Sequence, residues 1–313
     1  MIGERDVIER IGRIFRSPDP PMGIGDDCSV INIGGREMLV TSDMLSETTH
    51  LKYCGSYLLR GSMAMTVNLS DIAAKGGVPE YAFVTLGLPK TMRQRDVDSI
   101  AKGIKRTADS YGVRILGGDT KRARELMISI TLIGEAHGKP LLRSSARPGD
   151  LLAVTGTIGK AAYSYSRVSG HGRGGMICTP VARVKEGLIL SESGVVGASI
   201  DITDGLAISA HFLSRASGVR IVIEQDKIPV YRPGRLSGRR RKWDEFVLYW
   251  GGDYELLFTI RGEDGLAKLE RMGKIDFHVI GQVSEGRGVY ANYDGEIRSV
   301  EAKGYDSIRG GVF

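Results

Sequence analysis

Residues 57–88 read YLLRGSMAMTVNLSDIAAKGGVPEYAFVTLGL, and this stretch sets out the first half of the fold. Leu59, Met63 and Val67 recur at roughly helical spacing, which predicts a helix over 57–76. The apolar run at 81–88 is typical of a buried strand. Further along, we expect a helix over 93–111 with Thr91 as its N-cap, and strands over 113–116 and 126–133. The first half therefore alternates strands and helices.

The chain divides near its middle. Residues 137–150 are rich in Gly, Pro, Arg and Ser and predict a linker, after which a strand over 151–155 begins a second alternating series that runs to about residue 282. A length of 313 residues also favours two domains, at about 100–200 residues each. We predict an α/β protein with domains at 1–138 and 139–313.

Composition excludes several classes of protein. The hydrophobic fraction of 42% and the charged fraction of 26% are those of a globular protein. Three widely spaced cysteines without a CxxC motif argue against a disulfide framework or a structural zinc site, and predict a reducing compartment. There is no apolar run of about 18 residues, and the first 15 residues predict an amphipathic helix in place of a signal peptide. We therefore expect a cytoplasmic protein without a membrane partner.

The net charge of +6 leaves the partner open. The densest basic stretch, at 239–242, fits a solvated loop, a site that steers phosphate ligands, or a nucleic-acid contact. We expect no nucleic-acid partner, because no RNA-binding motif accompanies it. The sequence at 170–175 satisfies GxGxxG but lacks the strand and helix of a dinucleotide site, and P-loop, HExxH, GxSxG and HRD-type motifs are absent.

Aspartates recur at the ends of strand-like or Gly-rich segments. The motifs are Gly25-Asp26-Asp27, Thr41-Ser42-Asp43, Asn68-Leu69-Ser70-Asp71, Gly117-Gly118-Asp119-Thr120, Asp201-Ile202-Thr203-Asp204-Gly205 and Gly252-Asp253. One such aspartate is usually a turn former or an N-cap. A cluster of several would repel itself unless hard cations neutralised it, and Mg²⁺ is a natural choice because it is often shared with substrate phosphates. The pattern alone fits a Mg²⁺–phosphate site and scattered turns about equally.

Seven motifs together resemble one family. They are GIGDDCSV (23–30), VTSDML (40–45), NLSDIAAKGGVP (68–79), LGGDT (116–120), RSSARPGDLLAVTG (143–156), DITDGLA (201–207) and GGDYELLF (251–258), and in this order they resemble the thiamine-monophosphate kinases. The resemblance implies the two-domain fold of the aminoimidazole ribonucleotide synthetase-like superfamily. In that fold the N-terminal sheet forms a homodimer interface, the C-terminal domain is an α/β sandwich, and ATP binds with several Mg²⁺ ions.

The resemblance also implies roles for particular residues. The metal ligands would be Asp27, Thr41, Ser42, Asp43, Asp71, Asp119, Asp201 and Asp204; the ATP contacts would be Gly118, Asp119, Arg143 and Thr203; and the substrate contacts would be His50 and Tyr305. It implies direct transfer of the ATP γ-phosphoryl group onto thiamine monophosphate, giving thiamine diphosphate. No general base is expected, because the acceptor phosphate is already an anion.

Two positions depart from the family pattern. Gly252 stands where the family has a Glu associated with the substrate, which removes that contact to the cationic thiamine part, and Asp253 or Glu255 could compensate. Lys75 stands where the family more often has an apolar residue. Two alternatives therefore stay open: another ATP-using enzyme of the superfamily with a different acceptor, and a nucleotide-binding protein without catalysis.

Overall fold

The computed structural model describes residues 2–169, 179–231 and 247–313. The basic stretch at 239–242 and the GxGxxG sequence at 170–175 lie outside the described residues, so the interpretations placed on them stay predictions.

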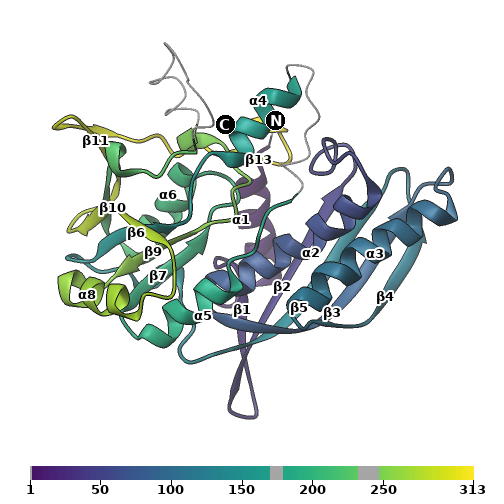
Figure 1. Ribbon diagram of the computed structural model, residues 1–313, viewed down its shortest axis with the longest axis horizontal. Helices are drawn as coiled ribbons and strands as arrows, with labels where there is room; N and C mark the ends of the chain where they lie inside the picture. Colours follow the sequence, from purple (N-terminus) through teal and green to yellow (C-terminus); the bar gives the residue numbers. More distant parts are fainter. Residues whose placement is uncertain (1, 170–178, 232–246) are drawn as a thin grey trace.

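The first half of the chain forms a five-stranded mixed sheet with helices (Figure 1). Its elements are α1 (Glu4–Phe15), β1 (Ser29–Ile33), β2 (Arg36–Ser46), α2 (Tyr57–Ala74), β3 (Gly77–Leu88), α3 (Gln94–Ser110), β4 (Arg114–Arg122) and β5 (Met127–Ala136). The strand order is β1-β2-β5-β3-β4, in which β3 and β4 run parallel and the other pairs are antiparallel.

The alternation of side chains along β5 sets the two faces of this sheet. Ile128, Ile130 and Leu132 are fully buried, because they point to the face on which α2 packs. The opposite face exposes large apolar side chains, among them Met44 at 54% and Phe83 at 40%. One face of the sheet therefore belongs to the core, while the other presents apolar surface.

The second half forms a seven-stranded mixed sheet. Its elements are η1 (Arg143–Ser145), β6 (Leu151–Thr155), α4 (Lys160–Ser169), α5 (Val184–Ser193), β7 (Val196–Asp201), α6 (Leu206–Ser217), β8 (Arg220–Glu224), η3 (Gln225–Lys227), β9 (Leu256–Ile260), α8 (Gly262–Met272), β10 (Phe277–Ser284), β11 (Gly288–Tyr293) and β12 (Glu296–Ser299). The strand order is β12-β11-β8-β10-β6-β9-β7. A short pair, β13 (Tyr305–Asp306) and β14 (Gly311–Val312), lies near the C-terminus.

The two halves share a core. The larger hydrophobic cluster contains Leu69 and Ile130 from the first half together with Leu190 and Phe258 from the second. Helix α5 approaches α2 so closely that a Cβ built on Gly187 would lie 2.0 Å from the carbonyl oxygen of residue 73. The predicted division into two α/β units is thus present as two mixed sheets; the boundary between 138 and 139 remains a prediction.

Most predicted elements are confirmed, with local corrections. The helix over 57–76 is α2, the helix over 93–111 is α3, and the strand over 81–88 is the later part of β3. Thr91 is not the N-cap of α3: the cap is Arg93, and its side chain makes no capping hydrogen bond. The strand over 113–116 continues to Arg122 in β4, because it pairs along its length with β3.

Two further findings concern the surface and the thiols. The amphipathic helix at the N-terminus forms as α1, but it has no buried residue, and its Phe15 is 73% exposed. Cys54 is disulfide-bonded, whereas the cysteine count predicted no disulfide framework. Among the described residues, no helix is both long and apolar enough to cross a membrane.

Candidate active site

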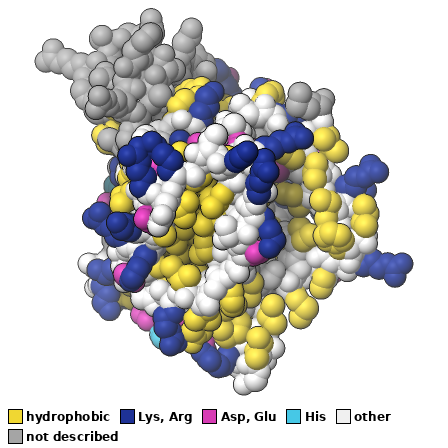
Figure 2. All heavy atoms as spheres, turned by 90° about the vertical axis from the view of Figure 1, so that its right-hand side faces the viewer, with side chains coloured by type: hydrophobic (Ala, Val, Ile, Leu, Met, Phe, Trp, Pro, Cys, Tyr) yellow, Lys and Arg dark blue, Asp and Glu magenta, His cyan; other side chains and the backbone are white. Residues whose placement is uncertain are grey.

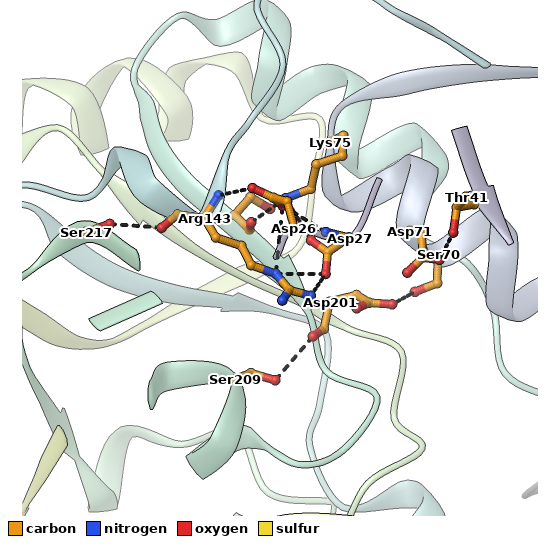
Figure 3. A network of polar contacts seen from close by, with 11 residues as sticks. Asp26, Asp27, Thr41, Ser70, Asp71, Lys75, Arg143, Asp201, Ser209 and Ser217 are labelled. Atoms are coloured by element: carbon orange, nitrogen blue, oxygen red, sulfur yellow. Dashed lines mark hydrogen bonds and ion pairs between the residues drawn. The ribbon is translucent and has the colours of Figure 1, made fainter. Parts of the chain in front are cut away.

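Three aspartates from separate parts of the chain meet where the two halves join (Figure 3). Asp27 precedes β1, Asp71 lies in the last turn of α2, and Asp201 ends β7. One carboxylate oxygen of each lies within 4.8 Å of the others. The family resemblance implies all three as metal ligands, and the fold brings them together.

Polar side chains fix two of these carboxylates. Thr41, on β2, donates its hydroxyl to Asp71 Oδ2 at 2.5 Å. Ser70 donates to Asp201 Oδ2 at 2.5 Å, across the joint between the two halves. Because Ser70 and Asp71 are neighbours in a helix, their side chains point about 100° apart and reach different carboxylate partners.

Asp43 belongs to the same group. It lies next to Thr41 and Ser42 on β2, and its backbone N–H donates to the Asn68 side-chain oxygen at 3.1 Å. Its carboxyl approaches Asp71 closely enough to share a hydrogen bond. Helix α2 thus holds strand β2 through Asn68 and Asp71, one turn apart on the same side of the helix.

Two cations lie against Asp27. Arg143, from η1, donates to Asp27 Oδ1 from Nε at 3.1 Å and also from Nη2. Lys75 places Nζ 2.7 Å from Asp27 Oδ2 and 2.5 Å from Asp26 Oδ1. Asp26 also accepts the backbone N–H of Arg143 at 2.9 Å, so it ties the two cations together.

The pKa values of the three carboxyls differ with their contacts: those of Asp71 and Asp201 are raised, and that of Asp27 is lowered. Burial raises the pKa of Asp71 well above its ordinary value, and the charges of Asp43 and Asp201 raise it further. Burial together with the charge of Asp27 raises the pKa of Asp201 to about 8. Burial favours a raised pKa for Asp27 as well, but the charges of Arg143 and Lys75 outweigh it and lower the pKa of this carboxyl. The group has more negative charge than the protein's own cations neutralise.

Asp204 lies beside the group in the loop that leads into α6. Burial raises its pKa to about 7, with a contribution from the charge of Glu4. Its carbonyl oxygen accepts the backbone N–H of Tyr305 at 2.8 Å, which places the predicted substrate residue next to a predicted metal ligand. Thr203 accepts the backbone N–H of Gly252 at 2.7 Å, so the 201–204 loop is held from both sides.

Two predicted ligands do not join the group. Ser42 points to the opposite face of the sheet, where its hydroxyl contacts Thr131 at 3.0 Å, because successive side chains of a strand alternate. Asp119 is exposed on edge strand β4 and pairs with Lys121. Asp119 is in register with Met44 of β2 across the sheet, but β3 and β5 lie between them. The two residues are therefore three strand spacings apart, or about 14 Å.

Gly118 has a packing reason for being glycine. Its φ is +150°, and a Cβ there would lie 1.7 Å from the carbonyl oxygen of Val84 on the neighbouring strand.

His50, the other predicted substrate residue, is half-buried and contacts the Thr49 hydroxyl through Nδ1 at 2.8 Å. Burial lowers the pKa of His50, so the ring is neutral at pH 7.

The carboxylates near Gly252 have structural partners. Gly252 has a φ of +96°, a conformation that favours glycine over glutamate. Asp253 accepts the backbone N–H groups of Gly159 and Ala161 at the start of α4. Glu255 is held by Arg183 and by the Thr155 hydroxyl at 2.7 Å. Both carboxylates are therefore held by contacts within the protein, and whether either compensates for the missing glutamate stays a prediction.

Four residues were not predicted for this site, although they lie in it. Asn68 and Ser70 belong to the same motif as Asp71, so their helical spacing was an available signal. Lys75 stands where the family more often has an apolar residue, so the resemblance gives it no role. Tyr254 is buried with a φ of +54°, and burial together with the nearby Asp43 and Asp201 charges raises the pKa of its hydroxyl.

Comparison with protein families gives two matches along the chain. Residues 25–136 match the N-terminal domain of AIR synthase related proteins, and residues 147–294 match the C-terminal domain of the same proteins. The chain is 37% identical over 308 residues to thiamine-monophosphate kinase of Pyrococcus horikoshii, with 96% of each chain covered. It is 30% identical over 324 residues to thiamine-monophosphate kinase of Aquifex aeolicus, with 97% of each covered.

Solved structures agree with these matches. AaThiL complexed with AMPPCP and TMP superimposes with a TM-score of 0.83 at 29% identity, covering 97% of this chain and 96% of that one. Thiamine monophosphate kinase from Aquifex aeolicus gives a TM-score of 0.79 at 28% identity, covering 94% and 97%. The HypE–HypF complex gives 0.77 at 20% identity, covering 94% and 98%, which is a likeness of fold alone.

Proposed function

The chain belongs to the thiamine-monophosphate kinase family, and we propose that Asp27, Asp71 and Asp201 hold the divalent cation that binds its nucleotide. The enzyme phosphorylates thiamine monophosphate with ATP and produces thiamine diphosphate. The observation that supports the metal role is the convergence of these three carboxylates from separate parts of the chain within 4.8 Å. Mg²⁺ is the natural ion for such a site because it takes oxygen ligands and commonly binds carboxylates and substrate phosphates at the same time.

The residues present fit such an ion. The surrounding donors are carboxylate and hydroxyl oxygens, which suit a hard cation. Asp27 Oδ2 is buried and has no hydrogen-bond donor among the described residues, although Lys75 Nζ lies 2.7 Å away. The raised pKa values of Asp71 and Asp201 indicate that the positive charge near these buried carboxylates is too small to balance their negative charge. When bound, Mg²⁺ neutralises charge on the phosphates and on the transferring group.

The protein's own part in the transfer is positioning. The acceptor is a phosphate monoester whose second pKa is about 6, so it is already a nucleophilic anion at pH 7. We therefore assign no general base. Thr41 and Ser70 fix the orientation of Asp71 and Asp201, and Arg143 fixes Asp27, so the ligand oxygens are in place before the nucleotide arrives.

The nucleotide and substrate contacts extend from this group. Arg143 uses Nε and Nη2 on Asp27, so its proposed contact with ATP would use the remaining Nη1. Gly118 and Thr203 are proposed as further ATP contacts. His50 is proposed to contact thiamine monophosphate as a neutral ring, and Tyr305, which lies beside Asp204, as an aromatic packing partner.

A homodimer is proposed through the first sheet. Its uncovered face exposes Ile33 at 61%, Met44 at 54% and Phe83 at 40%, which is apolar surface suited to a second copy. Figure 2 looks onto the β4 and α3 side of the molecule and shows hydrophobic side chains gathered between basic ones. Asp119 and Ser42 also lie at this sheet and away from the Asp27 group, and we propose that Asp119 acts on the site of the other copy.

Mixing two inactive variants tests this arrangement. If Asp119 acts across the dimer, Asp119→Asn and Asp71→Asn chains together form one intact site per heterodimer and recover part of the activity. Light scattering should give twice the mass of one chain, and Phe83→Asp should give the mass of one chain. No recovery on mixing would contradict the role of Asp119 across the interface, and a monomeric native protein would contradict the dimer.

The activity is tested by ADP release with Mg-ATP. Thiamine monophosphate, free thiamine and no acceptor are compared, and the product is identified by mass. The proposal predicts thiamine diphosphate from the monophosphate alone, and loss of turnover in Asp71→Asn with retained folding. ATP binding without turnover on thiamine monophosphate would contradict it and would point to Gly252 as a sign of a different acceptor.

A further inference from the structure

Lys75 is a lysine with no exposed surface. It is the C-cap of α2, one turn beyond Asp71, and its chain passes into the joint between the two halves. Its ammonium group meets three oxygens: Asp26 Oδ1 at 2.5 Å, Asp27 Oδ2 at 2.7 Å and the carbonyl oxygen of Ser199 at 2.9 Å. The contacts with Asp26 and the Ser199 carbonyl are hydrogen bonds, and the contact with Asp27 Oδ2 is an ion pair.

Folding stability does not explain a charge at this position. A buried ion pair gains little over well-packed apolar groups, because removing two charges from water is costly. Position 75 adjoins the fully buried Ala73 and Ala74, so apolar packing is close at hand. Lys75 instead brings a fixed positive charge to one side of Asp27, while Asp71 accepts a hydrogen bond from the neutral Thr41 hydroxyl and Asp201 accepts one from Ser70.

We propose that Lys75 is a positioning residue that acts as a built-in counter-ion and sets how tightly the Asp27–Asp71–Asp201 group binds divalent cations. The inference rests on the metal role proposed above. A positive charge beside Asp27 opposes a divalent cation at the same carboxylate, and Asp26, on the other side of the ammonium, offsets part of that charge. Lys75 therefore lowers the affinity of the free enzyme for the ion, and Asp26 limits how far it falls. Nucleotide phosphates then supply the additional negative charge that retains the ion.

The two members of the pair predict opposite effects. Lys75→Gln removes the positive charge, so nucleotide-free protein should bind Mn²⁺ at least about tenfold more tightly. Asp26→Asn removes the offsetting negative charge, so the same protein should bind Mn²⁺ at least about tenfold more weakly. Mn²⁺ is the probe because it takes the place of Mg²⁺ at oxygen sites, and free Mn²⁺ is measured by its electron paramagnetic resonance signal. Melting temperatures are measured in parallel.

A merely structural role predicts a different pattern. Each single variant breaks the same ion pair, so both would weaken Mn²⁺ binding or leave it unchanged. Equal or parallel shifts in affinity would therefore overturn the proposal.

The double variant Lys75→Gln/Asp26→Asn keeps the charge balance and avoids an unpaired buried charge, so it remains informative where a single variant does not fold. Its affinity for Mn²⁺ should lie within about threefold of wild type, since the two charge effects cancel. A change beyond tenfold would contradict the counter-ion role. Wild-type protein that binds no Mn²⁺ even when AMPPCP is present would instead contradict the proposed metal site itself.

Discussion

Asp201→Asn should stabilise the metal-free protein while abolishing its response to metal. Asp201 is 2% exposed at the end of β7, and burial with the charge of Asp27 raises its pKa to about 8. Asparagine keeps the shape and can still accept the hydrogen bond from Ser70, but it carries no charge. The substitution therefore removes the free-energy cost of a carboxyl that is more acidic in the unfolded chain than in the folded one.

The size of the stabilisation by Asp201→Asn follows from the raised pKa of Asp201. From the ordinary pKa of 3.8 up to pH 7, the folding free energy that the buried Asp201 carboxyl costs rises by about 1.4 kcal/mol per pH unit. Asp201→Asn therefore raises the free energy of unfolding by at most about 4 kcal/mol at pH 7. For a chain of this size, each kcal/mol changes the melting temperature by about 2 °C, so the rise is at most about 8 °C.

Scanning calorimetry in EDTA and in Mg²⁺ measures both parts of this prediction. Wild-type protein should gain stability from Mg²⁺, whereas Asp201→Asn should be more stable in EDTA and gain little. Asp109→Asn is the control, because Asp109 is an exposed carboxylate paired with Lys105 on α3, and its removal should change stability by less than about 0.5 kcal/mol. A lower melting temperature for Asp201→Asn in EDTA would refute the reasoning.

Three further predictions follow from the same contacts. Folding raises the carboxyl pKa from 3.8 to about 6 in Asp43, about 7 in Asp204 and about 8 in Asp201, so protonation of these groups stabilises the folded state fully below about pH 4. That contribution is lost as the pH rises through 6 to 8. Calorimetry should therefore show a melting temperature that falls over this range in EDTA, and a stabilisation by Mg²⁺ that grows over it. Gly118→Ala should destabilise by more than about 3 kcal/mol in urea unfolding because its Cβ would overlap the Val84 carbonyl oxygen, whereas Gly117→Ala, with no atom closer than 3.9 Å, should cost less than about 1 kcal/mol. Asp253→Ala should cost about 1–2 kcal/mol in the same assay, because two N–H groups at the start of α4 lose their acceptor, and an unchanged midpoint would contradict that capping role.

The sequence predicted the elements whose pattern is local. The apolar spacing of 57–76 and the run at 81–88 depend on the faces of single elements, and both appear as α2 and β3. Three of the predicted metal ligands, Asp27, Asp71 and Asp201, also converge. Their motifs place them next to turns and element ends, which a fold with two packed sheets brings together at its joint.

Two of the predicted ligands lie apart from the other three. Alternation along β2 sends Ser42 away from Thr41 and Asp43, and the strand order places Asp119 on an edge; neither follows from motif spacing. The N-cap of α3 moved from Thr91 to Arg93, a boundary that local preference places only approximately.

Lys75 shows the same limit within the site. Its neighbours in sequence are apolar, and its partners Asp26, Asp27 and the Ser199 carbonyl come from other elements. A buried lysine in an apolar helix end signals a hidden acidic partner, but only the fold identifies which one.

Diffraction from crystals grown with Mn²⁺, AMPPCP and thiamine monophosphate tests the central claim most directly, because the anomalous signal locates each ion. The account predicts an Mn²⁺ peak within coordination distance of oxygens of Asp27, Asp71 and Asp201, in contact with the nucleotide phosphates. Nucleotide bound with no ion at these three carboxylates would contradict it.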